Sequence, residues 1–243
     1  ALEGKTAGVQ LISTGAFRSD PACASGSTGS VREYWEDQSD GKLHATFDIY
    51  GPYTMDSNAS YYPTNWGTSY RESIIANVLR NHGGDDDIDF TQYRNGKTNV
   101  ESIIMIFAGY SAASTGVNTT IWPAQGNMSY YSDDGSGVNV ASYCCGPELQ
   151  GSSGTNLAGI GHICHELGHC FGLPDFYDTE RSSHSSTAKA PSYYYCLMEY
   201  GSYNNSSKTP PPLSILEKYL CGWVSNLTSG SSGEIVTLVR FDT

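Results

Sequence analysis

The stretch GHICHELGHCFGLPDFYD, residues 161–178, holds three of the chain's six histidines, two of its seven cysteines and three acidic residues. On a helix, which rotates by about 100° per residue, His165 and His169 lie one turn apart on the same face. The opposite side carries apolar side chains, namely Ile160, Ile163, Cys164, Leu167 and Phe171. A core helix would mix its histidines into the apolar stripe, so this separation favours a functional site.

The spacing H-E-x-x-H is suited to Zn²⁺. Two neutral imidazoles one turn apart can bind one zinc ion and leave room for a further ligand and a water molecule. The metal lowers the pKa of that water, and Glu166 can take its proton during attack on a carbonyl and then pass it to the leaving amine. We therefore predict His165 and His169 as metal ligands and Glu166 as the general base.

The residues that follow the pentapeptide add a third ligand. Gly172 can adopt the left-handed conformation that ends a helix, and Pro174 prevents the helix from resuming. Asp175, six residues after His169, is then placed to return beneath the metal. Asp178 is a competing candidate whose position is equally explained by a hydrogen bond within the loop, and we predict Asp175.

The extended pattern H-E-x-x-H-x-x-G-x-x-D resembles that of the metzincin metallopeptidases, which usually carry histidine as the third ligand. Aspartate occupies this position in the snapalysins and in the immune inhibitor A group of secreted bacterial peptidases. Further segments are similar to that group, namely SVREYWEDQSDGKLHATFDIYGPYTM (30–55), ESIIMIFAGY (101–110) and SILEKYLCGWV (214–224). The chain is thus identified as an immune inhibitor A-like metallopeptidase.

This resemblance implies a zinc endopeptidase, secreted or on the cell surface, that acts on protein or peptide substrates. It places Met198 in a turn beneath the metal. It also places Tyr200 where some metzincins have a tyrosine that approaches the metal or the oxyanion. A removed prosegment that inhibits the enzyme is expected from the family. Calcium is expected only weakly, because Arg94 and Lys97 stand where the group often has acids; an alternative site is Asp85, Asp86, Asp87 and Asp89, which a solvated turn also explains.

The periodicity of the chain predicts an α/β (α+β) metzincin-like fold. Strands are expected at 6–13, 43–50 and 101–109, and helices at 31–38, behind a Ser30–Glu33 capping box, at 69–81 and within 210–224. The Ser-, Gly- and Tyr-rich stretch 111–155 is expected to be irregular. The prediction is a mixed twisted sheet backed by helices, with an N-terminal subdomain (1–172) that ends with the active-site helix and a smaller, irregular C-terminal subdomain (173–243).

Composition limits the partners. The net charge of -12 argues against nucleic acid and anionic membranes, and no apolar run is long enough to span a bilayer. We expect a monomer. Seven cysteines without paired C-x-x-C motifs predict one to three disulfides in an oxidising compartment.

Several residues keep two interpretations. His162 is too far from His169 to share one zinc ion and is expected near the cleft. Cys164 and Cys170 are expected to pack or to form disulfides, and Cys23 to be free or paired at the surface. Trp122 and Tyr143 can line substrate subsites or pack. Two other functions stay open: a non-catalytic, metal-binding adhesion or binding module, and a zinc amidase acting on cell-wall peptides.

Overall fold

Strand β6 (Asn139–Leu149) is the centre of the main sheet in the computed structural model of the chain. β5 (Ala124–Tyr131) pairs with it antiparallel, whereas β3 (Asn99–Val100) and β4 (Ile103–Tyr110) pair with it in parallel. Since β5 shares its β6 partners with β3 and β4, it must lie on the opposite edge of β6. The sheet is therefore mixed, as predicted. The structure describes residues 8–9, 27–82, 84–94, 99–100, 102–117, 119–133, 135–179 and 192–225.

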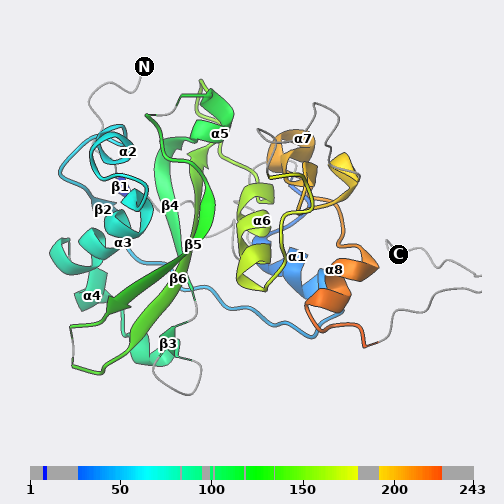
Figure 1. Cartoon of the computed structure of the whole chain (residues 1–243), viewed down its shortest axis with the longest axis horizontal. Helices are drawn as coiled ribbons and strands as arrows, with labels where there is room; N and C mark the ends of the chain where they lie inside the picture. The colour runs from blue at the N-terminus through cyan, green and yellow to red at the C-terminus, as the bar shows by residue number, and fades with distance from the viewer. Residues whose placement is uncertain are drawn as a thin grey trace, which may run out of the picture.

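Helices cover both faces of this sheet (Figure 1). Met105, Phe107 and Tyr143 pack in one apolar cluster with α3 (Tyr70–Asn81). The intervening Ile106, together with Cys144, packs in a second cluster with α1 (Val31–Gln38) and α6 (Gly161–Cys170). Alternate strand residues thus reach opposite cores, which explains the nearly continuous apolar run of β4.

Shorter elements connect these layers, and several match the predictions. The capping box between Ser30 and Glu33 opens α1, and α3 buries its predicted apolar face. Of the strand expected at 6–13, Gly8–Val9 is β1 and the rest lies outside the described residues. The other elements are β2 (Tyr53–Thr54, paired with β1), α2 (Tyr61–Asn65), α4 (Gly84–Asp87), η2 (Phe90–Gln92), α5 (Ala112–Thr115), η3 (Tyr193–Tyr195), η4 (Gly201–Tyr203), α7 (Asn204–Ser207) and α8 (Ile215–Leu220).

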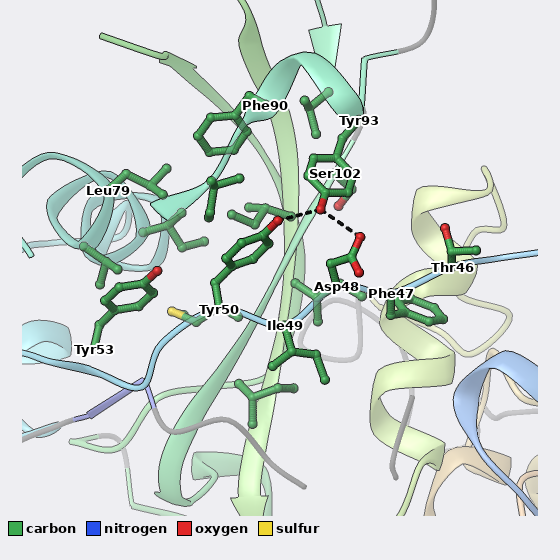
Figure 2. A pocket seen from close by; sticks show the side chains of 18 of the residues that line it. Thr46, Phe47, Asp48, Ile49, Tyr50, Tyr53, Leu79, Phe90, Tyr93 and Ser102 are labelled. Carbon is green, nitrogen blue, oxygen red and sulfur yellow. Dashed lines mark hydrogen bonds between the residues drawn. The ribbon is translucent and has the colours of Figure 1, made fainter. Parts of the chain in front are cut away.

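The strand expected at 43–50 is wrong. The segment is extended and alternates in exposure as the sequence suggests, but it belongs to no ladder and crosses from the α6 side to the α3 side of the sheet (Figure 1). Alternating exposure shows only that one side of the segment is buried and the other faces water. Side-chain packing can produce this pattern without pairing to another strand. Between this segment, α3 and β4 lies a mainly apolar cavity of about 410 Å³. At its edge the Tyr93 hydroxyl donates to Asp48 and contacts the Tyr50 hydroxyl (Figure 2).

The irregular structure expected at 111–155 is also wrong, because this stretch contains β5 and β6. Tyrosine and cysteine bury β6 where a hydropathy pattern looks for aliphatic residues: Tyr143, Cys144 and Cys145 are at most 3% exposed. The stretch that was expected to be irregular therefore supplies the central strand.

The C-terminal helix is shorter than the expected segment, and its leucines face the solvent. Within 210–224 only Ile215–Leu220 is helical, behind a capping box between Ser214 and Glu217. Leu216 and Leu220 are exposed, whereas Glu217 and Lys218 are buried. The Lys218 ammonium pairs with Asp40 at 3.2 Å, which offsets the cost of burying its charge.

The expected disulfides are absent among the cysteines that the structure describes. Cys144, Cys145, Cys164, Cys170, Cys196 and Cys221 are all free thiols. Four of them are buried core residues, a common role for unpaired cysteine. Cys23 lies outside the described residues. Within the described ranges, no helix is both long and apolar enough to cross a bilayer.

Candidate metal centre

Helix α6 ends in the way that its sequence predicts. Gly172 has φ +89°, a left-handed value that favours glycine. The Leu173 N–H reaches back to the Gly168 carbonyl at 3.0 Å, and the Gly172 N–H to that of His169 at 3.0 Å. Pro174 follows, and the chain turns back so that Asp175 comes to lie against the helix.

The three predicted ligands meet at this turn. Asp175 Oδ1 lies 3.3 Å from Nε2 of His165 and 3.4 Å from Nε2 of His169. The three candidate ligand atoms all lie within 4.8 Å of one another. Among the described residues, this is the one group of three or more histidines, cysteines and acids with such spacing.

Backbone carbonyls orient both imidazoles. Nδ1 of His165 is 2.9 Å from the Leu197 carbonyl, and Nδ1 of His169 is 2.8 Å from that of Leu173. If each Nδ1 carries the proton, each Nε2 of the neutral ring presents a lone pair toward Asp175. Asp175 Oδ1 is buried without a hydrogen-bond partner. Three lone-pair donors that face one another fit a shared cation, and the N, N, O set suits Zn²⁺.

The pKa values of His169 and Asp175 are shifted by their mutual contact. Burial alone would lower the pKa of His169, but the neighbouring Asp175 carboxylate and the Leu173 carbonyl raise it. Burial alone would raise the pKa of Asp175, but the two histidines hold it well below its usual range. Both shifts favour the charged forms of His169 and Asp175, as expected for groups of opposite charge that face one another.

Glu166 lies beside the ligand group but is not part of it. Its side chain is buried, and burial raises the pKa of the carboxyl group, an effect that His165 and His169 reduce and Asp175 reinforces. A backbone hydrogen bond from Gln125 in β5 also lowers this pKa. A carboxylate with a raised pKa is a stronger proton acceptor, as a general base requires.

Met198 packs against α6 at Gly168, the residue before His169. It is fully buried, and a Cβ added to Gly168 would come within 2.6 Å of its sulfur. Glycine at 168 thus allows the close approach of Met198 to α6. The adjacent Leu197 supplies the carbonyl that orients His165, so the segment 197–198 both packs against α6 and positions one of its histidines.

Sequence reasoning missed Tyr177. Burial, together with the charge of Asp175 and a hydrogen bond to it, raises the pKa of the Tyr177 phenol. Tyr200, which we predicted near the metal, stacks on Tyr177 with ring centroids 6.0 Å apart. The position of Tyr177 two residues after Asp175 was the signal available in the sequence. The predicted role of Tyr200 stays a prediction.

His162 is held away from the ligand group. Its Nε2 is 2.9 Å from the Ser207 hydroxyl, and its ring packs edge-on against Tyr203 at 4.9 Å. Ser207 has φ +63° and follows two further left-handed residues, Asn205 and Ser206. His162 thus fastens the strained segment 205–207 to the first turn of α6, which is a structural role close to the site.

Burial of His162 predicts a loss of stability in acid. Burial and the neighbouring His165 lower its pKa to about 4, whereas the unfolded value is about 6.5. Between these two pKa values the His162 imidazole is protonated in the unfolded chain but neutral in the native protein. The resulting stability is complete above about pH 6.5 and is lost as the pH falls toward 4, by up to about 3 kcal/mol.

Urea unfolding of the metal-free protein between pH 7 and 4 measures this effect. We expect the wild type to lose free energy of unfolding more steeply than His162→Gln across this window. His44→Gln is the control, because the His44 side chain is 68% exposed. Equal slopes for wild type and His162→Gln would contradict the assignment.

The remaining candidate residues lie outside the ligand group, either in the core or at the surface. Asp178 is not a member of the group that could hold a metal. Cys164 packs in the core as expected, and Cys170 contacts the Ser102 hydroxyl at 3.4 Å. Tyr143 is a core residue, whereas Trp122 is 49% exposed.

The acidic turn gives no support for calcium among the described residues. Asp87 accepts from the Tyr53 hydroxyl, and Asp89 caps η2 through the Thr91 N–H. The side chain of Asp85 lies outside the described set. Two of the four carboxylates of this turn, those of Asp87 and Asp89, are thus engaged in local hydrogen bonds.

The sequence of the whole domain decides the family. A family model described as the immune inhibitor A peptidase M6 catalytic domain matches residues 17–218. The chain belongs to this family. The match spans α6, the return to Asp175 and the Met198 turn, so the resemblance found in the sequence is confirmed. Membership in the M6 family makes the chain a metallopeptidase, with a metal and a protein or peptide substrate implied. No curated protein matches the chain.

Proposed function

We propose that this M6 domain is a secreted, zinc-dependent endopeptidase in which His165, His169 and Asp175 hold the metal and Glu166 is the general base. The observation that carries the proposal is the convergence of two oriented Nε2 atoms on Asp175 Oδ1, which is buried without a hydrogen-bond partner. Zinc rather than calcium follows from the two nitrogen ligands. Secretion rests on the family alone.

Bound zinc supplies a Lewis acid that polarises the scissile carbonyl and lowers the pKa of the attacking water. Glu166 accepts a proton from that water and delivers it to the leaving amine. Because Glu166 is buried, its carboxylate is poorly solvated, which keeps its pKa raised. In this proposal Tyr200, or Tyr177 beside Asp175, donates a hydrogen bond to the developing oxyanion.

The proposed cleft divides the chain at residue 172. Residues 1–172 provide α6 and β5, and residues 173–243 provide Asp175, Met198 and the tyrosines after it. Gln125 in β5 bonds to Glu166, so the edge of β5 away from β6 faces the general base. An extended substrate would add to this edge as a further strand. Removal of an inhibitory prosegment and a monomeric state remain part of the proposal.

Cleavage of a mixed peptide library by the zinc-loaded protein tests this function. We expect products from internal bonds, and no products after treatment with a chelator until zinc is restored. Release of products only from isolated cell-wall peptides would favour the amidase. Zinc binding at one ion per chain without any product would favour a non-catalytic module and contradict the proposal.

A further inference from the structure

Five tyrosines form one contiguous group of rings beside the candidate metal centre. Tyr200 is its centre, and the ring contacts extend outward from it. The other members, with their ring-centroid distances to Tyr200, are Tyr177 at 6.0 Å, Tyr193 at 4.9 Å, Tyr194 at 6.4 Å and Tyr203 at 6.5 Å. We call these five residues the tyrosine cluster.

The backbone beneath the tyrosine cluster is firmly held. The Glu199 carboxylate is 2% exposed and accepts hydrogen bonds from the backbone N–H groups of Ser192 and Tyr193. The Tyr200 N–H donates to the Tyr193 carbonyl at 3.2 Å, and the Asn204 side chain donates to the Tyr194 carbonyl at 2.9 Å. These hydrogen bonds fix the backbone that carries the rings before a substrate binds, which lowers the entropic cost of binding to the rings.

The tyrosine cluster runs from the metal centre to the solvent. At its inner end Tyr177 hydrogen-bonds to Asp175. At its outer end Tyr193, Tyr194 and Tyr203 are 51%, 46% and 41% exposed. A purely structural cluster would bury these rings, because aromatic side chains gain most when they leave water. Aromatic rings that stay exposed next to the candidate metal centre indicate a surface that binds a ligand.

We infer that the tyrosine cluster selects substrates with an aromatic side chain close to the scissile bond. This inference rests on the proposed peptidase function and names its preferred substrate. The rings of the cluster meet mostly at tilted or edge-to-face angles, such as 56° between Tyr193 and Tyr200 and 80° between Tyr193 and Tyr194. Such arrangements are those that aromatic pairs prefer, so a further aromatic ring extends them. An aliphatic side chain of similar size gains only the burial of its surface.

Peptides that are identical except for phenylalanine or leucine at one position test the inference. The varied position is moved through the three residues on each side of a bond that the wild type cleaves. We expect phenylalanine to raise kcat/KM by about 3- to 10-fold over leucine at one position. The variant with Tyr193→Ala, Tyr194→Ala and Tyr203→Ala should lose this ratio, because its kcat/KM should fall more for the phenylalanine peptide than for the leucine peptide.

The matched control replaces the same three tyrosines by phenylalanine, which keeps the rings and should keep the preference. Circular dichroism and zinc content verify that each variant is folded, and the single Tyr194→Ala change, expected to lower the ratio in part, replaces the triple variant if that fails to fold. A wild type that cleaves both peptides equally, or an alanine variant that keeps the preference, would overturn the inference alone. A zinc-loaded wild type that cleaves no peptide would overturn the proposed function as well.

Discussion

Replacing Glu166 by glutamine is expected to lower kcat/KM for peptide cleavage by about 10³-fold while the zinc content stays at one ion per chain. Glutamine has nearly the same shape, but its amide cannot accept the proton of the attacking water. Zinc should remain because Glu166 is not one of the three converging ligands. Folding should be preserved, since a neutral side chain at this buried position avoids the desolvation that raises the Glu166 pKa.

The measurement is kcat/KM over a range of pH, with zinc content determined on the same samples. In the wild type, activity should fall as the pH drops below the pKa of Glu166, and this acid limb should vanish from the residual activity of the variant. Glu36→Gln is the control, because Glu36 pairs with Arg32 on the surface of α1. A Glu166→Gln protein that keeps more than a tenth of the wild-type kcat/KM would mean that another group is the base.

The convergence of His165, His169 and Asp175 was predictable from the sequence because its determinants are local. Two histidines one turn apart, a left-handed Gly172 and the following Pro174 bring Asp175 back to the helix within the eleven residues 165–175, and each step follows from backbone geometry. The separation of apolar and polar faces on α6 likewise needs only the helical period. The contact of Tyr177 with Asp175 was not predictable, because it depends on a side-chain orientation that no spacing encodes.

The sheet was harder to predict because its partners are distant in sequence. β6 pairs with three strands and is buried from both faces, yet its interior residues include Tyr143, Cys144 and Cys145 rather than a run of valine and isoleucine. Segment 43–50 shows the opposite failure, with a clear alternation and no ladder. Whether a tyrosine or a cysteine is buried depends on its neighbours in the fold. Whether an extended segment joins a sheet depends on whether a strand edge lies beside it.

Helix α8 shows how a distant partner reverses a local pattern. Leu216 and Leu220 have the spacing of an apolar helix face, but they are exposed, and Glu217 and Lys218 are buried instead. Glu217 is satisfied by the Ser214 backbone N–H and contacts the Cys196 thiol, and Lys218 by Asp40, which is 178 positions away in the chain. Paired charges can therefore be buried where an unpaired charge would be too costly.

Replacing Asp175 by asparagine is expected to weaken zinc binding by at least about 100-fold and to abolish cleavage at low zinc concentration. Asparagine keeps an oxygen at the ligand position but removes the negative charge that faces the two Nε2 atoms. Loss of an outer partner of a metal ligand already costs about 10- to 100-fold in affinity, so weakening a ligand itself should cost no less. The loss of Asp175 also removes the carboxylate that raises the pKa of His169 in the metal-free protein.

Competition with a chromophoric chelator measures the zinc affinity of each protein, and Tm with and without zinc provides an independent readout. Because zinc binds only the folded centre, the wild type should gain Tm on adding zinc at a concentration where Asp175→Asn gains almost none. Asp178→Asn is the matched control, since Asp178 is the competing candidate three residues along the same loop, and it should behave like the wild type. If Asp178→Asn loses zinc and Asp175→Asn retains it, the third ligand is Asp178, and the convergence of Asp175 on the two histidines reflects only the ion pairing of the metal-free protein.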